Sequence, residues 1–323
     1  MPQLRVYVEG PIRFSSEMLF LAGHASVRAT VGIGEPAHQY GPDGRSRLDG
    51  CVEWCDRLCL YVDDLSTADC AVLPHKWKGS ADPVYARLNQ ACLLAGKLLL
   101  AFYNDDDARP VVGLGSTTVL FRTSLYAHNR ARHPLERPLA PLVPDCFTGA
   151  FLSPTEPLSV GFCGNVCAMR RRVLDELAAA SDLHTNFISR RGYWAPGIDP
   201  HVARVEFWEN MRSSLFVVCV RGAGNFSYRL YETLMMGRIP IIVHTDGVYP
   251  WAEQLLRVCV CVDWGVLGTG RLVESVRTFY EAHYGALDVA QRTCRTLWEQ
   301  CYSGPGILRD VWDTVSRPHR LNF

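Results

Sequence analysis

Segment 214–251 carries the residue types and spacing that best match a chemical function. It reads SLFVVCVRGAGNFSYRLYETLMMGRIPIIVHTDGVYPW, and its first apolar run predicts a buried strand that ends at Val220. A turn with Gly222 and Gly224 follows, and a predicted helix opens directly after Asn225. Backbone N–H groups at a glycine-bearing turn and at a helix start form a ready anion site. The segment therefore predicts a phosphate-binding turn.

Side chains on this turn and helix can neutralise a diphosphate. Arg221 and Arg229 can each hold phosphate oxygens bidentately, and Ser227 can cap the helix or donate to a phosphate. Glu232 lies one turn beyond Arg229, where a carboxylate can accept hydrogen bonds from ribose hydroxyls. The competing interpretation is an ordinary strand–turn–helix unit with an Arg229–Glu232 surface pair.

The elements that position this segment are alternating apolar runs and helical patterns. Strands are predicted at Leu4–Val8, Cys70–Leu73, Lys97–Tyr103, Val119–Arg122, Leu158–Cys163, Leu215–Val220, Ile239–Val243 and Val258–Val262. Helices are predicted at Leu48–Leu60, Val84–Ala95, Ala168–Ala180, Val202–Ser213 and Tyr228–Met236, with two or three more in Gly270–Val315. Continuous apolar strands between helices indicate parallel sheets covered on both faces.

The chain divides near its middle. Six prolines between residues 131 and 157 interrupt regular structure and indicate a linker. We therefore expect two doubly wound α/β domains, residues 1–150 and 151–323, with the last helix free to pack back on the first domain. Ligands of such sheets bind at the carboxyl ends of the strands, so the cleft between the domains is the expected site.

Composition limits the classes of protein and of partner. The 323 residues include 33 Lys and Arg and 33 Asp and Glu, and a net charge of zero argues against nucleic acid as a partner. No apolar run reaches the roughly 18–20 residues of a transmembrane segment. The 13 cysteines, an odd number placed in apolar runs, indicate reduced thiols and a cytoplasmic location. Cys51, Cys55 and Cys59 share one helical face, which we interpret as a buried face and not as a metal site.

Several motifs together resemble one family, the exostosin-type glycosyltransferases. The specific match is the C-terminal signature formed by Arg221-Gly222, Ser227, Arg229, Glu232, Gly237, Ile239-Pro240-Ile241-Ile242 and Pro250. Weaker matches follow in the family's order in the first half, at Asp64-Leu-Ser-Thr-Ala68-Asp69-Cys-Ala-Val-Leu-Pro74 and Val119–Tyr126. Eukaryotic members usually carry a membrane anchor. Its absence here leads us to expect a viral, bacterial or otherwise cytosolic enzyme.

The resemblance implies a GT-B fold, in which two Rossmann-like domains face each other across a cleft. It implies an inverting enzyme that needs neither a cofactor nor a catalytic metal. The C-terminal domain would bind a nucleotide-sugar, most often a UDP-sugar with GDP as the minority, and the N-terminal domain a glycan or glycoprotein acceptor. The alternative from another class is a non-catalytic module that binds nucleotide-sugar or glycan on the same fold.

Inversion needs a general base beside the acceptor hydroxyl. The strand-end rule selects Asp105, Asp106 and Asp107 after the strand Lys97–Tyr103, and also His75 and Glu9 after two other strands. A solvated acidic turn and a structural histidine are the competing interpretations, and the three aspartates could instead hold a metal ion. The Asp triplet is slightly favoured, because the strand before it is the most certain of the three.

Further donor contacts are expected at strand ends and in the turn. Gly222, Asn225 and Tyr228 belong to the predicted phosphate turn, and Asn165, Arg122 and His244 each end or follow a strand. Among Arg170, Arg171 and Arg172, one arginine can face the cleft. The pair Tyr193-Trp194 can stack on a base or a sugar ring.

Overall fold

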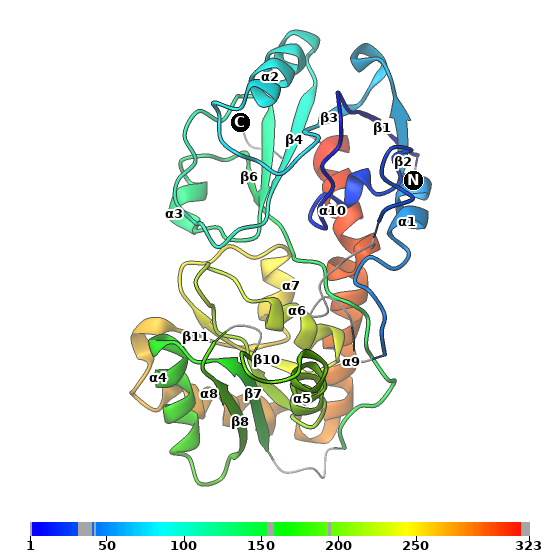
Figure 1. The fold of residues 1–323 in the computed structure, drawn as a ribbon. Coiled ribbons are helices and arrows are strands. Elements are labelled where there is room, and N and C mark those ends of the chain that lie inside the picture. The colour runs from blue at the N-terminus through cyan, green and yellow to red at the C-terminus, as the bar shows by residue number, and fades with distance from the viewer. Residues whose placement is uncertain (1, 32–40, 42, 154–157, 193–194, 318–323) are drawn as a thin grey trace.

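The computed structural model describes residues 2–31, 41, 43–153, 158–192 and 195–317. The chain forms two lobes, drawn one above the other in Figure 1, and each lobe is built on one parallel sheet. Helices lie on the faces of both sheets. This is the arrangement expected from continuous apolar strands that alternate with helices.

The N-terminal lobe holds a six-stranded sheet in the order β2-β1-β3-β4-β5-β6. Its strands are β1 (Leu4–Tyr7), β2 (Cys59–Val62), β3 (Cys70–Val72), β4 (Leu98–Tyr103), β5 (Thr118–Arg122) and β6 (Glu136–Pro138). Its helices are α1 (Cys51–Leu58), α2 (Pro83–Ala95) and α3 (Ala127–Arg130). Local chemistry sets the bounds of α2: the Asp82 carboxylate caps its first turn, and Gly96 ends it in the left-handed conformation at φ 64°.

The C-terminal lobe holds a five-stranded sheet in the order β11-β10-β9-β7-β8. Its strands are β7 (Ser159–Asn165), β8 (His184–Arg190), β9 (Phe216–Val218), β10 (Ile239–His244) and β11 (Val260–Asp263). Its helices are α4 (Ala168–Ala178), α5 (Pro200–Arg212), α6 (Tyr228–Met235), α7 (Ala252–Leu256), α8 (Arg271–His283) and α9 (Leu287–Leu297). Counted within each lobe, both sheets begin with the order 2-1-3-4-5, so each has its switch point between the first and third strands.

Three strands of the structure were not expected from the sequence. β2 starts at Cys59, immediately after α1, so the predicted helix Leu48–Leu60 ends early. β8 is a partly exposed edge strand with the polar sequence HTNFISR, which lacks an apolar pattern. β6 lies inside the predicted linker, and its Pro138 is tolerated because β6 is the last strand of the sheet. Cys51, Cys55 and Cys59 are buried as predicted, although the third belongs to β2.

The chain returns to the N-terminal lobe at its end. After α9, a π-helical turn (Trp298–Tyr302) leads into α10 (Gly304–Ser316), which Figure 1 draws beside α1 in the upper lobe. The ring of Trp54 lies so close to Gly304 that a Cβ there would overlap it, at 1.7 Å. Trp312 Nε1 also donates to the carbonyl of Pro2 at 3.1 Å. These contacts join the last helix to the first lobe.

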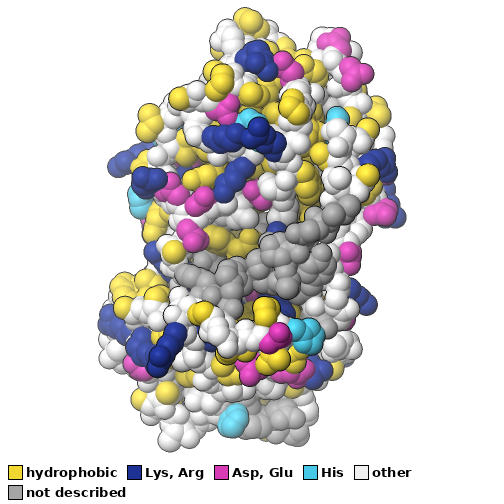
Figure 2. Space-filling model, in the orientation of Figure 1, with side chains coloured by type: hydrophobic (Ala, Val, Ile, Leu, Met, Phe, Trp, Pro, Cys, Tyr) yellow, Lys and Arg dark blue, Asp and Glu magenta, His cyan; other side chains and the backbone are white. Residues whose placement is uncertain are grey.

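Both signs of charge are interspersed on the face drawn in Figure 2, over both lobes. Among the described residues, the structure contains no helix long and apolar enough to span a membrane.

Asp310 on α10 is predicted to destabilise the fold near neutral pH. Burial raises its pKa to about 6, and the neighbouring Asp313 adds to the shift. A carboxyl with a raised pKa favours the folded state when protonated, so its contribution is lost as pH rises from about 4 to about 6. We expect Asp310→Asn to raise the free energy of unfolding by about 1–3 kcal/mol at pH 7.5 and to add little at pH 4. Urea unfolding at both pH values measures this.

The matched control is Asp182→Asn. Asp182 is exposed, and the hydrogen bond from Arg277 lowers its pKa, so its substitution should give no gain at pH 7.5. An equal gain for Asp310→Asn at both pH values would contradict the assignment.

Candidate functional site

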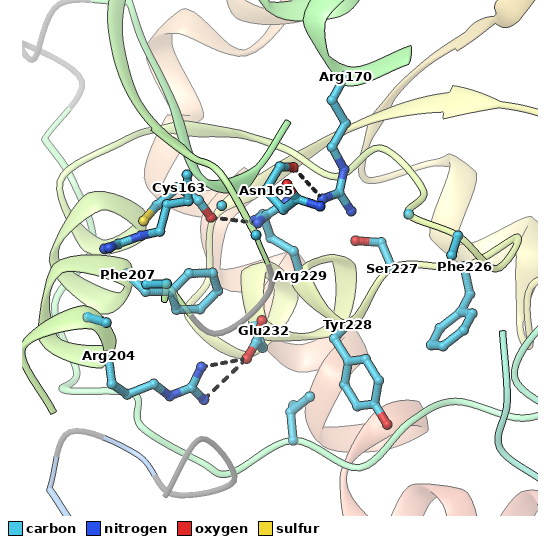
Figure 3. Close-up of a pocket in the computed structure, with 18 of the residues that line it drawn as sticks. Cys163, Asn165, Arg170, Arg204, Phe207, Phe226, Ser227, Tyr228, Arg229 and Glu232 are labelled. Carbon is cyan, nitrogen blue, oxygen red and sulfur yellow. Dashed lines mark hydrogen bonds and ion pairs between the residues drawn. The ribbon is translucent and has the colours of Figure 1, made fainter. Parts of the chain in front are cut away.

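A cavity of about 670 Å³ lies between the lobes. It opens at the carboxyl ends of β7 and β9, which is the switch point of the C-terminal sheet and the place where doubly wound sheets bind ligands. The N-terminal lobe supplies Arg47 and Asp106, and the linker after it supplies Leu142, Val143 and Pro144. The C-terminal lobe supplies the residues labelled in Figure 3, from the end of β7, from α4 and α5, and from the turn before α6 and α6 itself.

The start of α6 forms one wall of this cavity. Ser227 occupies the N-cap position, but its hydroxyl makes no capping hydrogen bond, so the predicted capping role is wrong. Ser227 and Tyr228 both line the cavity, as does Gly222 in the preceding turn. The first residues of a helix, one of which carries a hydroxyl, therefore line the cavity, and a helix start is where an anion site is expected.

Arg229 is the cation at the centre of this wall. It is 8% exposed, and its Nη2 donates to the carbonyl of Cys163 at 2.6 Å. Its Nε and Nη1 are buried and have no hydrogen-bond partner among the described residues. Burial, together with the neighbouring charge of Arg170, lowers the pKa of Arg229 to about 10, which keeps it charged at neutral pH. A buried cation with two open donors is costly unless an anion completes it.

Two aromatic rings hold Arg229 in place. Its guanidinium lies 4.4 Å from the ring centroid of Phe162 and 5.6 Å from that of Phe207. Gly164 leaves room on the β7 side, since a Cβ there would come within 2.4 Å of the Arg229 Nη2. The rings and the glycine fix the guanidinium of Arg229, a residue of the cavity wall, in one orientation.

Glu232 pairs with a different arginine from the one that the sequence suggested. Both terminal nitrogens of Arg204 on α5 lie 3.3 Å from Glu232 Oε1, as Figure 3 shows. Glu232 is 6% exposed, so the alternative of an Arg229–Glu232 surface pair is wrong. The second carboxylate oxygen leaves Glu232 able to accept from a ligand hydroxyl.

Arg170 joins the two strand ends beneath the cavity. Its Nη1 donates to the carbonyl of Asn165 at 2.7 Å, and its Nε donates to Val220 and Arg221 carbonyls at 3.2 Å. Asn165 and Arg170 both line the cavity. Arg170 is thus the member of the Arg170–Arg172 run that faces the site.

Four of the predicted donor contacts do not line the cavity. Three of these four residues interact instead with other side chains or backbone groups of their own lobe. Arg122 is 1% exposed and pairs with Glu136, so it cannot reach a diphosphate. Asn225 is buried and exchanges hydrogen bonds with Thr245. His244 lies 3.6 Å from Asp263 at the end of the sheet.

The fourth contact, Arg221, belongs to the seam between the lobes. Its Nη1 donates to the Tyr126 hydroxyl, and Tyr126 forms an antiparallel bridge with Gly247 across the lobes. The backbone N–H of Ala127 also donates to the carbonyl of Asp246 at 2.9 Å. Arg221 therefore contacts the other lobe in this structure, outside the residues that line the cavity.

Of the five candidate bases, Asp106 lines the cavity. Its neighbours in the triplet turn to other partners: Asp105 pairs with Lys76 at 3.1 Å, and Asp107 pairs with Arg109 at 2.8 Å. The hydrogen bond from Arg109 lowers the pKa of Asp107 to about 2. The carboxylates of Asp105 and Asp107 thus have separate partners, while Asp106 lines the cavity.

The other two candidate bases also have partners of their own. His75 is 7% exposed and pairs with Asp82 at 3.3 Å, and Glu9 pairs with Arg87 at 3.0 Å. Neither His75 nor Glu9 lines the cavity. Tyr193-Trp194 lies outside the described residues.

Sequence reasoning missed several residues of the cavity. Arg204 and Phe207 lie within the predicted helix Val202–Ser213, but nothing in their spacing indicated which face meets the site. Arg190 ends β8, the polar strand that was not predicted, and the strand-end rule would have selected it. Arg47 comes from a segment of the first lobe with no regular pattern.

Two Rossmann-like domains that face a shared cavity constitute the GT-B architecture, and the chain has this fold. No protein-family model and no curated protein sequence matches the chain. The chain is similar to solved structures of WaaG, a glycosyltransferase involved in lipopolysaccharide biosynthesis (9% identity, TM-score 0.41, 97% of this chain and 100% of that one), and of a glycosyltransferase from Rickettsia africae (8%, 0.43, 100% of each). It is also similar to the spinosyn rhamnosyltransferase SpnG complexed with spinosyn aglycone (9%, 0.39, 96% and 100%).

Proposed function

We propose that this protein is an inverting glycosyltransferase that moves a sugar from a nucleotide-sugar to a hydroxyl of a glycan or glycoprotein acceptor. The observation that supports this most directly is Arg229, at a helix start beside a cavity between two Rossmann-like lobes. Two nitrogens of its buried guanidinium have no hydrogen-bond partner in the part of the chain that the structure describes. A diphosphate supplies the charge and the acceptors that such a group lacks. The exostosin-type signature around Arg229 favours UDP as the nucleotide.

The proposed reaction is a single displacement. The acceptor oxygen bonds to the anomeric carbon while the bond from that carbon to the diphosphate oxygen breaks. The hydroxyl proton passes to a base, for which we propose Asp106 because it lines the cavity from the opposite lobe. Arg229 and the start of α6 stabilise the charge that develops on the departing diphosphate.

The cations of the site make a catalytic metal unnecessary in this proposal. Arg170, Arg190, Arg204 and Arg229 line the cavity from the C-terminal lobe, where Arg190 pairs with Glu206 and Arg204 with Glu232. Arg229 is the cation that this proposal assigns to the diphosphate. Fixed guanidinium groups in a partly buried site can neutralise a diphosphate in the way that a divalent ion does elsewhere.

Thermal unfolding with added nucleotides tests the proposed function. At about 100 times its Kd, UDP should raise the unfolding midpoint by roughly 5 °C, and EDTA should leave the shift intact. Uridine serves as the matched control because it lacks the diphosphate, and GDP tests the choice of base. An equal shift with uridine would contradict a site built on Arg229. Loss of the UDP shift in EDTA and its return with Mg²⁺ would contradict metal independence.

A further inference from the structure

A set of buried polar residues lies beneath the loop that carries Asp106. Arg122 and Glu136 are 1% and 0% exposed, and Arg122 Nη1 lies 2.5 Å from Glu136 Oε2. Asn129, on α3, is also 1% exposed. Burying two charges costs several kcal/mol of desolvation per ion, so a buried pair by itself is weak support for stability. A gain in fold stability therefore does not explain why Arg122 and Glu136 are buried here.

Their hydrogen bonds converge on three consecutive carbonyls of the loop. Arg122 Nη2 donates to the Asp107 carbonyl at 2.7 Å, and Arg122 Nη1 donates to the Arg109 carbonyl at 3.1 Å. Asn129 Nδ2 donates to the Ala108 carbonyl at 2.6 Å. The carboxylate of Glu136 pairs with the Arg122 guanidinium and fixes its orientation. Three fixed donors thus hold the backbone immediately after Asp106.

The other end of the loop is held by the lobe that carries the donor site. Asn104 Nδ2 donates to the Tyr228 hydroxyl at 3.0 Å. Gly224 approaches so closely that a Cβ there would lie 2.8 Å from both Cα and Oδ1 of Asp106. The backbone N–H of Asn225 donates to Ser124 Oγ at 2.8 Å. The position of Asp106 relative to the start of α6 is therefore set by contacts at both ends of its loop.

We propose that Arg122 and Asn129 are positioning residues that fix the Asp106 carboxylate at the cavity. This inference rests on the proposed function, in which Asp106 is the base. It gives Arg122 a role in the acceptor lobe, in place of the donor contact that the sequence suggested. The arrangement also explains why Asp106 and Asp107 face different surroundings. Arg122 holds the backbone carbonyls of Asp107 and Arg109, and the side chains of these two residues pair with each other.

Arg122→Lys is the variant that tests this proposal. Lysine keeps a positive charge beside Glu136, but one ammonium group cannot reproduce the fork that reaches the Asp107 and Arg109 carbonyls. We expect kcat to fall by about 10- to 100-fold, because a displacement of about 1 Å in a reacting group costs up to about 100-fold. KM for the donor and the affinity for UDP should change little, because the donor binds on the other lobe.

Arg238→Lys is the matched control. Arg238 is equally buried at 1% exposure, and its guanidinium holds the Arg212 and Met236 carbonyls, away from the acidic loop. A merely structural effect would lower the stability of both variants and leave kcat per folded molecule unchanged in both. The proposal predicts a loss of kcat in the Arg122 variant alone.

Two further measurements separate this inference from the proposed function. The backbone amides of Asp107 and Arg109 donate to loop carboxylates. Their hydrogen exchange should accelerate in Arg122→Lys and not in Arg238→Lys, whatever the protein's activity. In an Asp106→Asn background, Arg122→Lys should cause no further loss of kcat.

Unchanged exchange at Asp107 and Arg109 would overturn the positioning role. A loss of kcat that persists undiminished in the Asp106→Asn background would overturn it as well, because Arg122 would then act through another group. A wild-type protein that fails to bind UDP would contradict the proposed function, and the exchange measurement would still decide whether Arg122 fixes the loop.

Discussion

Replacing Arg229 by methionine is expected to weaken UDP binding by about 10- to 150-fold. The change removes charge-assisted hydrogen bonds to phosphate, each worth roughly 1.5–3 kcal/mol, while it keeps an apolar side chain against Phe162 and Phe207. Isothermal titration of UDP measures the loss. Because Nε and Nη1 are buried with no hydrogen-bond partner within the described ranges, removal of this charge should not lower the unfolding midpoint of the free protein.

Arg238→Met is the control for this prediction. Arg238 is also buried in the C-terminal lobe, but backbone carbonyls of Arg212, Met236 and Gly237 satisfy its guanidinium. Its loss should destabilise the fold and leave UDP affinity unaltered. UDP binding that is undiminished in folded Arg229→Met would rule out the proposed donor site.

Replacing Asp106 by asparagine is expected to cut turnover by about 10²- to 10⁴-fold while UDP affinity stays the same. An amide cannot take the acceptor proton, and a positioned general base contributes an effect of this size. The proposed donor contacts lie on the opposite lobe and should keep their geometry. Turnover with a nucleotide-sugar donor and titration with UDP, carried out on the same protein sample, provide the two readings.

Asp105→Asn and Asp107→Asn are the matched controls, since both residues belong to the same loop and are committed to Lys76 and Arg109. Both variants should keep near-normal turnover. His75→Ala and Glu9→Gln belong in the same series, because one of them would replace Asp106 as the base if Asp106→Asn stayed active. A wild-type protein that binds UDP but neither transfers nor hydrolyses a donor sugar would instead be a non-catalytic nucleotide-sugar-binding module.

The sequence by itself determined the architecture and the turn and helix start that form one wall of the cavity. Apolar runs such as Leu98–Tyr103 and Ile239–His244 have few ways to be buried other than as central parallel strands. The turn after β9 and the start of α6 follow from local chemistry, because glycines and a helix start are readable within a dozen residues. These features depend on neighbours along the chain, and this is why they were predictable.

Tertiary structure alone decided which charged side chains face the cavity. Arg122 and Arg229 both lie at ends of elements in apolar surroundings. Arg122 pairs with Glu136, whereas Arg229 donates to the Cys163 carbonyl and has no carboxylate partner among the described residues. Asp106 differs from its neighbours because the other lobe approaches it through Gly224, 118 positions further along the chain. The partner of each group comes from a distant segment, and a charge that is neutralised by such a partner is no longer available to a ligand.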